Sequence, residues 1–302
     1  MKSPNKYALG RIDRVGHLRT DEIWVRERLA DRATRIYPMW RARCLVTDGD
    51  LPQAVALPPD EALLAMAEGV TFLGTVDGVA HFALDLSHHE APPVEPAAGA
   101  FLDLRAVGPR MAEDEASVLA YARAMTTWHS RHLYCSVCGS PTVAKQAGHV
   151  RQCTNERCNA QCFPRTDPAV IMLIHDGGDR VVLGRQSRWP AGQRSILAGF
   201  VEPGESLEDA VAREVFEEVG LRIADVTYHS SQPWPFPANI MLGFTARATT
   251  FDIDVNTDEL EGAWWFSRDR IRNSPENDEF RLPRRDSISR RLIEEWAAGD
   301  CG

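Results

Sequence analysis

The chain has 302 residues, of which 44% are hydrophobic, 25% charged and 8% aromatic. At roughly 100 to 200 residues per domain, this length predicts two domains with room for a small insert, and it excludes a single small disulfide-stapled fold. The 43 Asp and Glu residues outnumber the 34 Lys and Arg residues, giving a net charge of -9. That balance argues against a broad cationic surface for duplex DNA, and an acidic protein that handles phosphates needs metal ions as intermediaries.

The apolar residues and the cysteines predict the compartment. No apolar stretch reaches the roughly 18 to 20 residues that cross a bilayer, and the amino terminus is polar rather than signal-like, so we expect no membrane association. Five of the seven cysteines lie between Cys135 and Cys162. In a reducing compartment such crowding indicates metal ligation rather than disulfides. Because the sequence shows no bilayer-spanning stretch and no signal-like amino terminus, we expect a cytoplasmic protein.

The first part of the chain predicts a small β-rich domain. Short apolar runs alternate with Asp-Gly and Pro-rich turns between Ile23 and Leu86, which is typical of short strands. Apolar residues at helical spacing follow over Ser117–Arg131. We place this domain at residues 1–130, ending in a connecting helix.

The last part mixes strands and helices. The runs Ala169–Ile174 and Arg180–Gly184 are joined by a Gly-rich turn and predict a hairpin. A helix is expected from about Leu207 to Val219, strands from Arg222 to Asp254, and an amphipathic closing helix over Ile288–Ala297. The fold class expected is α/β or α+β.

The cysteines between these parts predict a zinc site. Cys135 and Cys138 form a tight CxxC pair, and Cys153 and Cys158 follow with four residues between them where two would be usual. Two such pairs make a closed tetrahedral thiolate site for a structural Zn²⁺. Cys162 competes as the fourth ligand, but it lies where the next strand should have begun, so we favour the first four.

We place a zinc ribbon at residues 131–165. A nucleic-acid role for this ribbon stays open, although a solvated face explains its few basic residues about as well.

The most specific segment runs from Gly199 to Leu221. Ser206 followed by Asp209 predicts a capping-box helix start, and Gly220 predicts its left-handed end. The helix is therefore bounded at both ends by local signals.

Within this helix Glu214, Glu217 and Glu218 stand at i, i+3 and i+4. Three like charges so close cost the helix stability unless cations neutralise them. Carboxylate oxygens suit Mg²⁺ or Mn²⁺, which keep several waters and bridge to substrate phosphates. The alternative interpretation is a solvated acidic helix face. The surrounding glycines, Arg213 and Glu205 argue strongly against it.

The whole segment resembles the Nudix box, G-x5-E-x7-R-E-U-x-E-E-x-G-U, at every defined position. The resemblance implies a hydrolase acting on a nucleoside diphosphate linked to another moiety, with a mixed sheet between helices over residues 166–302. Carried onto this chain, it makes Glu214 and Glu218 the principal metal ligands and Glu217 a further ligand or water-activating base. Arg213 would orient these carboxylates.

A metal ligand from outside the box is also implied. Glu259 resembles the position at which the closer subfamily supplies this ligand, and Glu261 is the other candidate for that position. The alternative is that both are surface charges of a loop.

The segment Ser231-Gln-Pro-Trp-Pro-Phe-Pro237 carries three alternating prolines and two aromatic rings. It predicts a stiff, extended wall that suits a nucleobase, although a packing motif is an equal physical reading. Downstream of a Nudix box and a zinc ribbon it resembles the signature of the NADH pyrophosphatase subfamily. That resemblance implies cleavage of NAD(H) to AMP and nicotinamide mononucleotide, a homodimer, and removal of NAD caps from RNA 5′ ends.

The same resemblance assigns a set of substrate-binding positions. They are Arg105, Phe163, Ala198, Gln232, Pro233, Trp234, Pro235, Phe236, Pro237, Ala238, Asn239 and Ser289. One departure is Gly148, where some relatives carry a substrate-contacting glutamate. Two alternatives stay open: a broader ADP-ribose or dinucleotide pyrophosphatase, and an inactive zinc-ribbon module that binds nucleotides or RNA.

Overall fold

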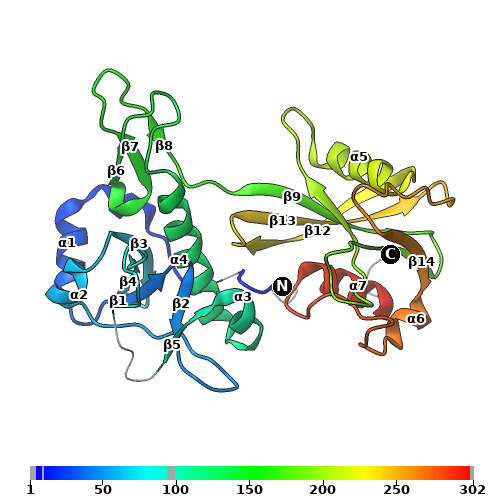
Figure 1. Ribbon diagram of the computed structural model, residues 1–302, viewed down its shortest axis with the longest axis horizontal. Coiled ribbons are helices and arrows are strands. Elements are labelled where there is room, and N and C mark those ends of the chain that lie inside the picture. The colour runs from blue at the N-terminus through cyan, green and yellow to red at the C-terminus, as the bar shows by residue number, and fades with distance from the viewer. Residues whose placement is uncertain (1–4, 9, 94–98, 300–302) are drawn as a thin grey trace. The chain divides into compact units, whose positions relative to one another are not determined.

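The computed structural model describes residues 5–8, 10–93 and 99–299 (Figure 1). The chain forms two compact units. The N-terminal unit comprises Tyr7–Thr166 and Trp234–Ala238, and the C-terminal unit comprises Met1–Lys6, Asp167–Pro233 and Asn239–Gly302. Each is described by itself.

A five-stranded sheet forms the centre of the N-terminal unit, with the order β3-β4-β1-β2-β5. Strands β1 and β4 are parallel and the other neighbours antiparallel. The strands are β1 (Arg35–Trp40), β2 (Arg43–Val46), β3 (Gly69–Val76), β4 (Val79–Asp85) and β5 (Ala100–Asp103). The helices are α1 (Glu22–Ala30), α2 (Glu61–Ala65), α3 (Leu104–Val107) and α4 (Glu113–Arg131). The expected β-rich domain is thus present, and its connecting helix begins at Glu113 rather than Ser117.

Helix α4 covers one face of this sheet. Tyr37 and Met39 of β1 point to the same core cluster as Ala122, Met125 and Trp128 of α4. Ile36 of the same strand belongs to a second cluster on the opposite face, because side chains alternate along a strand.

The zinc ribbon belongs to the same unit. Its strands β6 (Thr142–Lys145), β7 (Val150–Cys153) and β8 (Gln161–Cys162) form an antiparallel sheet. The buried His149 donates from Nε2 to the Phe72 carbonyl of β3 at 2.7 Å. Gly148 beside it has φ +91°, and a Cβ there would come within 2.7 Å of Thr71 Oγ1. In this chain a glutamate at position 148 would not fit the close approach of ribbon and sheet.

The C-terminal unit is built on a six-stranded mixed sheet with the order β12-β13-β9-β10-β14, and β11 pairs with β9. The strands are β9 (Asp167–His175), β10 (Arg180–Arg185), β11 (Leu197–Phe200), β12 (Ile223–Trp234), β13 (Asn239–Ala248) and β14 (Gly262–Ser267). The helices are α5 (Leu207–Val219), α6 (Arg268–Arg272) and α7 (Ile288–Ala298). Strands β9 and β13 are parallel.

The expected hairpin between β9 and β10 diverges after its turn. The two strands pair where Val181 meets His175. Strand β11 then pairs with β9 from Met172 to Ala169. This pairing brings the start of the Gly199–Leu221 segment to the centre of the sheet.

Helices α5 and α7 cover opposite faces of this sheet, as expected. Val170 and Met172 of β9 share a core cluster with Val215 of α5. Ile171 and Leu173, the alternate residues, share the other cluster with α7. The sheet is therefore buried on both sides, which fits the apolar run of β9.

Among the described residues, no helix combines the length and the apolar character needed to span a bilayer.

Candidate metal and substrate sites

Three carboxylates of the C-terminal unit converge. Glu214 and Glu218 lie one turn apart on α5, and the loop after β13 supplies Glu259. One oxygen of each lies within 4.8 Å of the others. We call these three residues the carboxylate cluster.

The loop that carries Glu259 is fixed to the end of α5. The Asn256 backbone amide donates to the Glu218 carbonyl at 3.0 Å, and its side-chain amide lies 3.3 Å from Glu259 Oε1. Leu260, the residue after Glu259, is buried in the core beneath α5. Sequence reasoning missed Asn256; the available signal was an amide residue three positions before an acid in a turn.

Glu261, the rival of Glu259, lies elsewhere. Its carboxylate forms an ion pair with Arg185 Nε at 3.0 Å, and its backbone amide donates to the Arg185 carbonyl at 2.8 Å. Glu259 is the one that joins the cluster.

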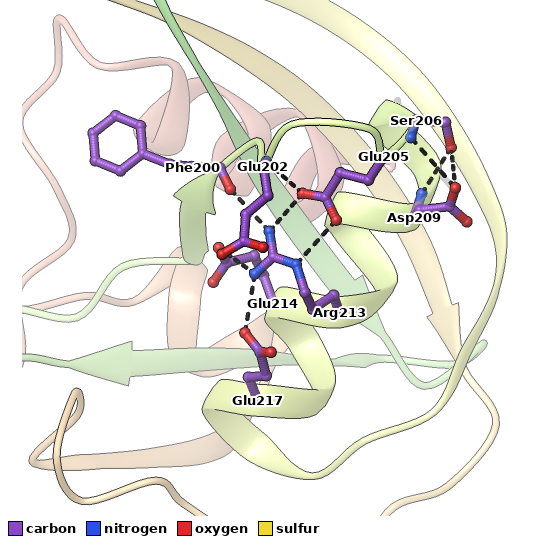
Figure 2. A network of polar contacts seen from close by, with 8 residues as sticks. All are labelled: Phe200, Glu202, Glu205, Ser206, Asp209, Arg213, Glu214 and Glu217. Atoms are coloured by element: carbon purple, nitrogen blue, oxygen red, sulfur yellow. Dashed lines mark hydrogen bonds and ion pairs between the residues drawn. The ribbon is translucent and has the colours of Figure 1, made fainter.

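Arg213 sits at the centre of a polar network at the start of the cluster (Figure 2). Its guanidinium bonds Glu205 through Nε at 3.0 Å and through a terminal nitrogen at 2.6 Å. The other terminal nitrogen bonds Glu214 Oε1 at 2.9 Å and Glu217 Oε2 at 3.0 Å. The Phe200 carbonyl accepts a further bond at 2.9 Å. Arg213 thus holds the loop before α5 and two helix carboxylates in one arrangement.

The acids in and around this network have pKa values shifted in opposite directions. The bond to Arg213 lowers the pKa of Glu205 to about 2. Glu218, by contrast, is only 3% exposed, and burial raises its pKa to about 8, with the charges of Glu214 and Glu259 adding to the shift. Burial also raises the pKa of Glu214. The cluster is therefore costly to ionise without a cation.

The site fits a hard divalent cation. Glu218 Oε2 is buried with no hydrogen-bond partner among the described residues, although buried polar atoms normally have one. Gly199 leaves the space for Glu214, since a Cβ at that glycine would lie 1.8 Å from the Glu214 carboxyl carbon. Two buried carboxylates and an exposed one converge here, and with the unpartnered Glu218 oxygen they match the ligand chemistry of Mg²⁺ or Mn²⁺.

Glu217 is placed differently from the other box glutamates. Its side chain is half exposed and bonds Arg213, and it is not one of the three converging residues. It stands beside the cluster on the solvent side of α5.

The four favoured cysteines also converge. Cys135 Sγ lies 3.8 Å from Cys158 Sγ, and Cys138 Sγ lies 3.5 Å from Cys153 Sγ. All four sulfurs are within 4.8 Å of one another. A zinc tetrahedron with bonds of about 2.3 Å has edges of roughly 3.8 Å, so the sulfurs fit zinc.

The widened second pair copies the turn of the first. The amides of Val137 and Asn155 donate to the sulfurs of Cys135 and Cys153, each at 3.4 Å. The turn after the second pair is completed by Asn159 at φ +47°, where the first uses a glycine. Cys162 lies in β8 with its sulfur near the Phe163 carbonyl, outside the group of four.

Substrate positions in the C-terminal unit lie mostly on the α7 side of the sheet. Ala198 packs against the cluster beneath α7, and its backbone amide offsets part of the Glu218 shift. Asn239 begins β13 opposite Asp167, and the Ser289 hydroxyl lies 2.8 Å from that of Ser195. Pro233 is half-buried at the end of β12.

Gln232 has a scaffold role in this unit. It is fully buried, donates to the carbonyls of Asp286 at 2.7 Å and Lys6 at 3.1 Å, and accepts from the Ile288 amide at 2.8 Å. Because these bonds satisfy its amide, the structure gives no support to a substrate contact by this side chain.

The remaining substrate positions belong to the N-terminal unit. Trp234 and Phe236 pack partly buried against its core, edge to face with Tyr7. The guanidiniums of Arg105 and Arg123 each lie 4.8 Å from the Phe236 ring centre. The two aromatic rings of the segment thus contribute to the packing of this unit. Pro235 is buried, Pro237 and Ala238 are half-buried, and Phe163 is 60% exposed.

Comparison with known proteins agrees with this arrangement. Three family models match: an NADH pyrophosphatase-like rudimentary NUDIX domain at residues 33–128, an NADH pyrophosphatase zinc ribbon domain at 130–163, and a NUDIX domain at 165–288. The cysteine cluster and the ribbon match together support structural zinc.

Relatives share the same parts. The NAD-capped RNA hydrolase NudC of Mycobacterium bovis is 39% identical over 274 residues, covering 85% of this chain and 84% of that protein. Nudix hydrolase 19, chloroplastic, of Arabidopsis thaliana is 46% identical, covering 59% of this chain and 42% of that protein. NUDT12 of Macaca fascicularis, an NAD-capped RNA hydrolase, is 42% identical, covering 62% and 43%.

This chain thus spans less than half the length of the plant and primate relatives but most of the mycobacterial one. The chain belongs to the Nudix hydrolase superfamily, in its NADH pyrophosphatase subfamily with a zinc ribbon.

Proposed function

We propose that this protein hydrolyses the pyrophosphate bond of NAD(H), releasing AMP and nicotinamide mononucleotide, and that it also removes NAD caps from RNA 5′ ends. The observation that carries the proposal is the carboxylate cluster, in which the buried Glu218 has an unpartnered oxygen. The subfamily match and the names of the relatives support the substrate.

Glu214, Glu218 and Glu259 would hold Mg²⁺ or Mn²⁺. A divalent cation, when bound, neutralises pyrophosphate charge and acidifies water near the phosphorus. Arg213 keeps Glu214 and Glu217 in fixed orientations through its bonds to both. Glu217, half exposed beside the cluster, is suited to accept a proton from the attacking water.

Substrate recognition is assigned by resemblance. We propose Arg105, Phe163, Ala198, Asn239, Ser289 and the segment 233–238 as the positions that contact the dinucleotide. Gln232 would act indirectly, because its bonds to Asp286 and Ile288 tie β12 to the start of α7. A homodimer follows from the same subfamily resemblance, and the reduced cysteine cluster supports a cytoplasmic location.

The test is product analysis. The zinc-loaded protein is incubated with NADH, ADP-ribose at matched concentration, and NAD-capped RNA, each titrated with Mg²⁺ and Mn²⁺. We expect AMP and reduced nicotinamide mononucleotide from NADH, and 5′-monophosphate RNA from the capped substrate.

Faster turnover of ADP-ribose would favour the broader pyrophosphatase. Absence of metal-dependent AMP release from any of them would leave a binding module and overturn the proposal.

A further inference from the structure

The N-terminal unit contains a cavity of about 420 Å³ that the proposed chemistry does not use. Its lining includes Arg35, Tyr37, Ala54, Ala56, Val79 and His81. It lies at the beginning of the parallel pair β1 and β4, where Arg35 is the register partner of His81. A volume of this size is within the roughly 300 to 1,000 Å³ range of small-molecule sites.

Two aromatic rings, those of Tyr37 and His81, are part of the lining. The Tyr37 and His81 rings are stacked at 5.7 Å with an interplanar angle of 21°, and the Tyr37 hydroxyl lies 3.0 Å from His81 Nδ1. Burial and the charge of Arg35 lower the pKa of His81 to about 4, so the imidazole is neutral at pH 7. When Tyr37 donates to Nδ1, the proton of the neutral ring is on Nε2, which becomes a hydrogen-bond donor.

Arg35 supplies a cation. Its side chain is exposed, and in the described parts of the chain no residue forms a hydrogen bond or ion pair with its guanidinium. The carboxylates around it are engaged elsewhere: Asp77, which also lines the cavity, pairs with Arg11 at 2.8 Å, and Glu115 accepts from the Ala54 amide. A guanidinium and a neutral imidazole donor on neighbouring strands suit a phosphate group.

The position of the cavity has a counterpart in the other unit. Helix α4 packs across β1 and β4 as α7 packs across β9 and β13, and both strand pairs are parallel. On the α7 side of the C-terminal sheet lie Ala198 and Ser289, and Asn239 begins β13. The resemblance assigns these three residues to the substrate. The cavity therefore occupies the place in the N-terminal sheet that corresponds to the proposed nucleotide side of the C-terminal sheet.

We propose that this cavity is a second, non-hydrolytic site that binds a nucleoside monophosphate, with the phosphate on Arg35 and His81 and the nucleoside against Ala54, Ala56 and Val79. The choice of AMP as ligand rests on the proposed function, because AMP is a product of that reaction. In the described residues, neither group of metal-ligating side chains lies at this cavity. The site binds without cleaving.

The test is calorimetric titration of the full-length, zinc-loaded protein with AMP, in the presence of Mg²⁺. We expect a class of AMP sites whose affinity falls about tenfold or more in Arg35→Gln. Ala56→Leu fills the cavity without changing its charge and should remove the same class, which keeps the test decisive if Arg35→Gln folds poorly. Arg32→Gln changes an exposed arginine outside the lining and should leave AMP binding unchanged.

Inorganic phosphate and adenosine serve as comparison ligands. Weaker binding of both than of AMP supports a nucleotide site, whereas equal affinity for phosphate alone would overturn it. AMP titrations that are identical in the original protein and in both cavity variants would also overturn it. Because the titration follows AMP itself and needs no turnover, its outcome is independent of whether NADH is hydrolysed.

Discussion

The two sheets of this protein share an order but not a chemistry. In both, a parallel pair (β1 with β4, β9 with β13) lies inside the sheet with a further strand on each side, and a helix (α4 or α7) covers one face. The connection from β11 to β12 carries the thirteen-residue helix α5, whereas the connection from β2 to β3 carries only the five-residue α2. The sheet thus serves as a scaffold in both units, and helix α5 supplies two of the three carboxylates of the cluster.

The largest effect is expected from removing the zinc that stabilises the N-terminal unit, the unit without the acidic helix. Cys153→Ser should reduce zinc from about one ion per chain to none and unfold the ribbon, because zinc binding there is folding free energy. We expect a loss of about 4 kcal/mol or more in the N-terminal unit. Metal analysis and thermal unfolding measure this.

The matched control is Cys162→Ser, which alters a cysteine outside the group of four and should keep its zinc. Zinc loss in Cys162→Ser with retention in Cys153→Ser would show that the ligand assignment is wrong.

The acidic helix is tested by Glu218→Gln. This nearly isosteric change removes one ligand charge and should lower NADH turnover about 100-fold or more while the fold stays intact. Glu61→Gln on α2, the helix in the corresponding connection of the other sheet, should leave turnover unchanged. Equal rates of NADH turnover in the two variants would show that the carboxylates of α5 have no special role in the reaction.

The pKa of Glu218 gives a pH dependence with a definite sign. Because its pKa is raised from the ordinary 4.5 to about 8, the folded state holds a proton that the unfolded state releases between these values. Without Mg²⁺ or Mn²⁺, stability should therefore fall as pH rises from 6 to 8, by roughly 2 kcal/mol from this group.

Denaturant unfolding at the two pH values, compared with Glu218→Gln, isolates that contribution. The variant should lack it, and added Mn²⁺ should restore the stability of the unaltered protein at pH 8. The same pH dependence of stability in both proteins would contradict the raised pKa of Glu218.

A smaller effect is expected from Arg213→Lys. Lysine keeps the charge but cannot bond Glu205, Glu214 and Glu217 in one planar fork. We expect about a tenfold fall in kcat with little change in KM for NADH, because the change affects the orientation of the carboxylates. Arg222→Lys, an exposed arginine just after α5, is the control. A change confined to KM would indicate that Arg213 acts on the substrate instead.

Local sequence signals predicted the two ends of α5, but the choice between Glu259 and Glu261 required the tertiary structure. Ser206 and Gly220 mark the helix ends in the sequence, and both act as expected. The choice between Glu259 and Glu261 depended on Arg185, which is remote in sequence and pairs with Glu261. Two glutamates two positions apart in an irregular loop have no periodicity that tells which of them joins the cluster.

The buried polar residues were the hardest to interpret. Gln232 lies in a segment that looks like a binding wall, yet its amide links segments distant in sequence, at Lys6 and Asp286. Side chains of this kind are recognised only when their partners are known. The same holds for Asn256, whose contacts to Glu218 and Glu259 come from the turn of the loop.

The proposed hydrolysis depends on the binding of a divalent cation by the carboxylate cluster. The most direct measurement is Mn²⁺ binding by electron paramagnetic resonance in the zinc-loaded protein, compared between the unaltered chain, Glu218→Gln, and Glu208→Gln at an exposed position of the same helix. We expect bound Mn²⁺ in the unaltered chain and in Glu208→Gln, and binding weakened about tenfold or more in Glu218→Gln. Equal Mn²⁺ binding in all three proteins, or none in any, would contradict it.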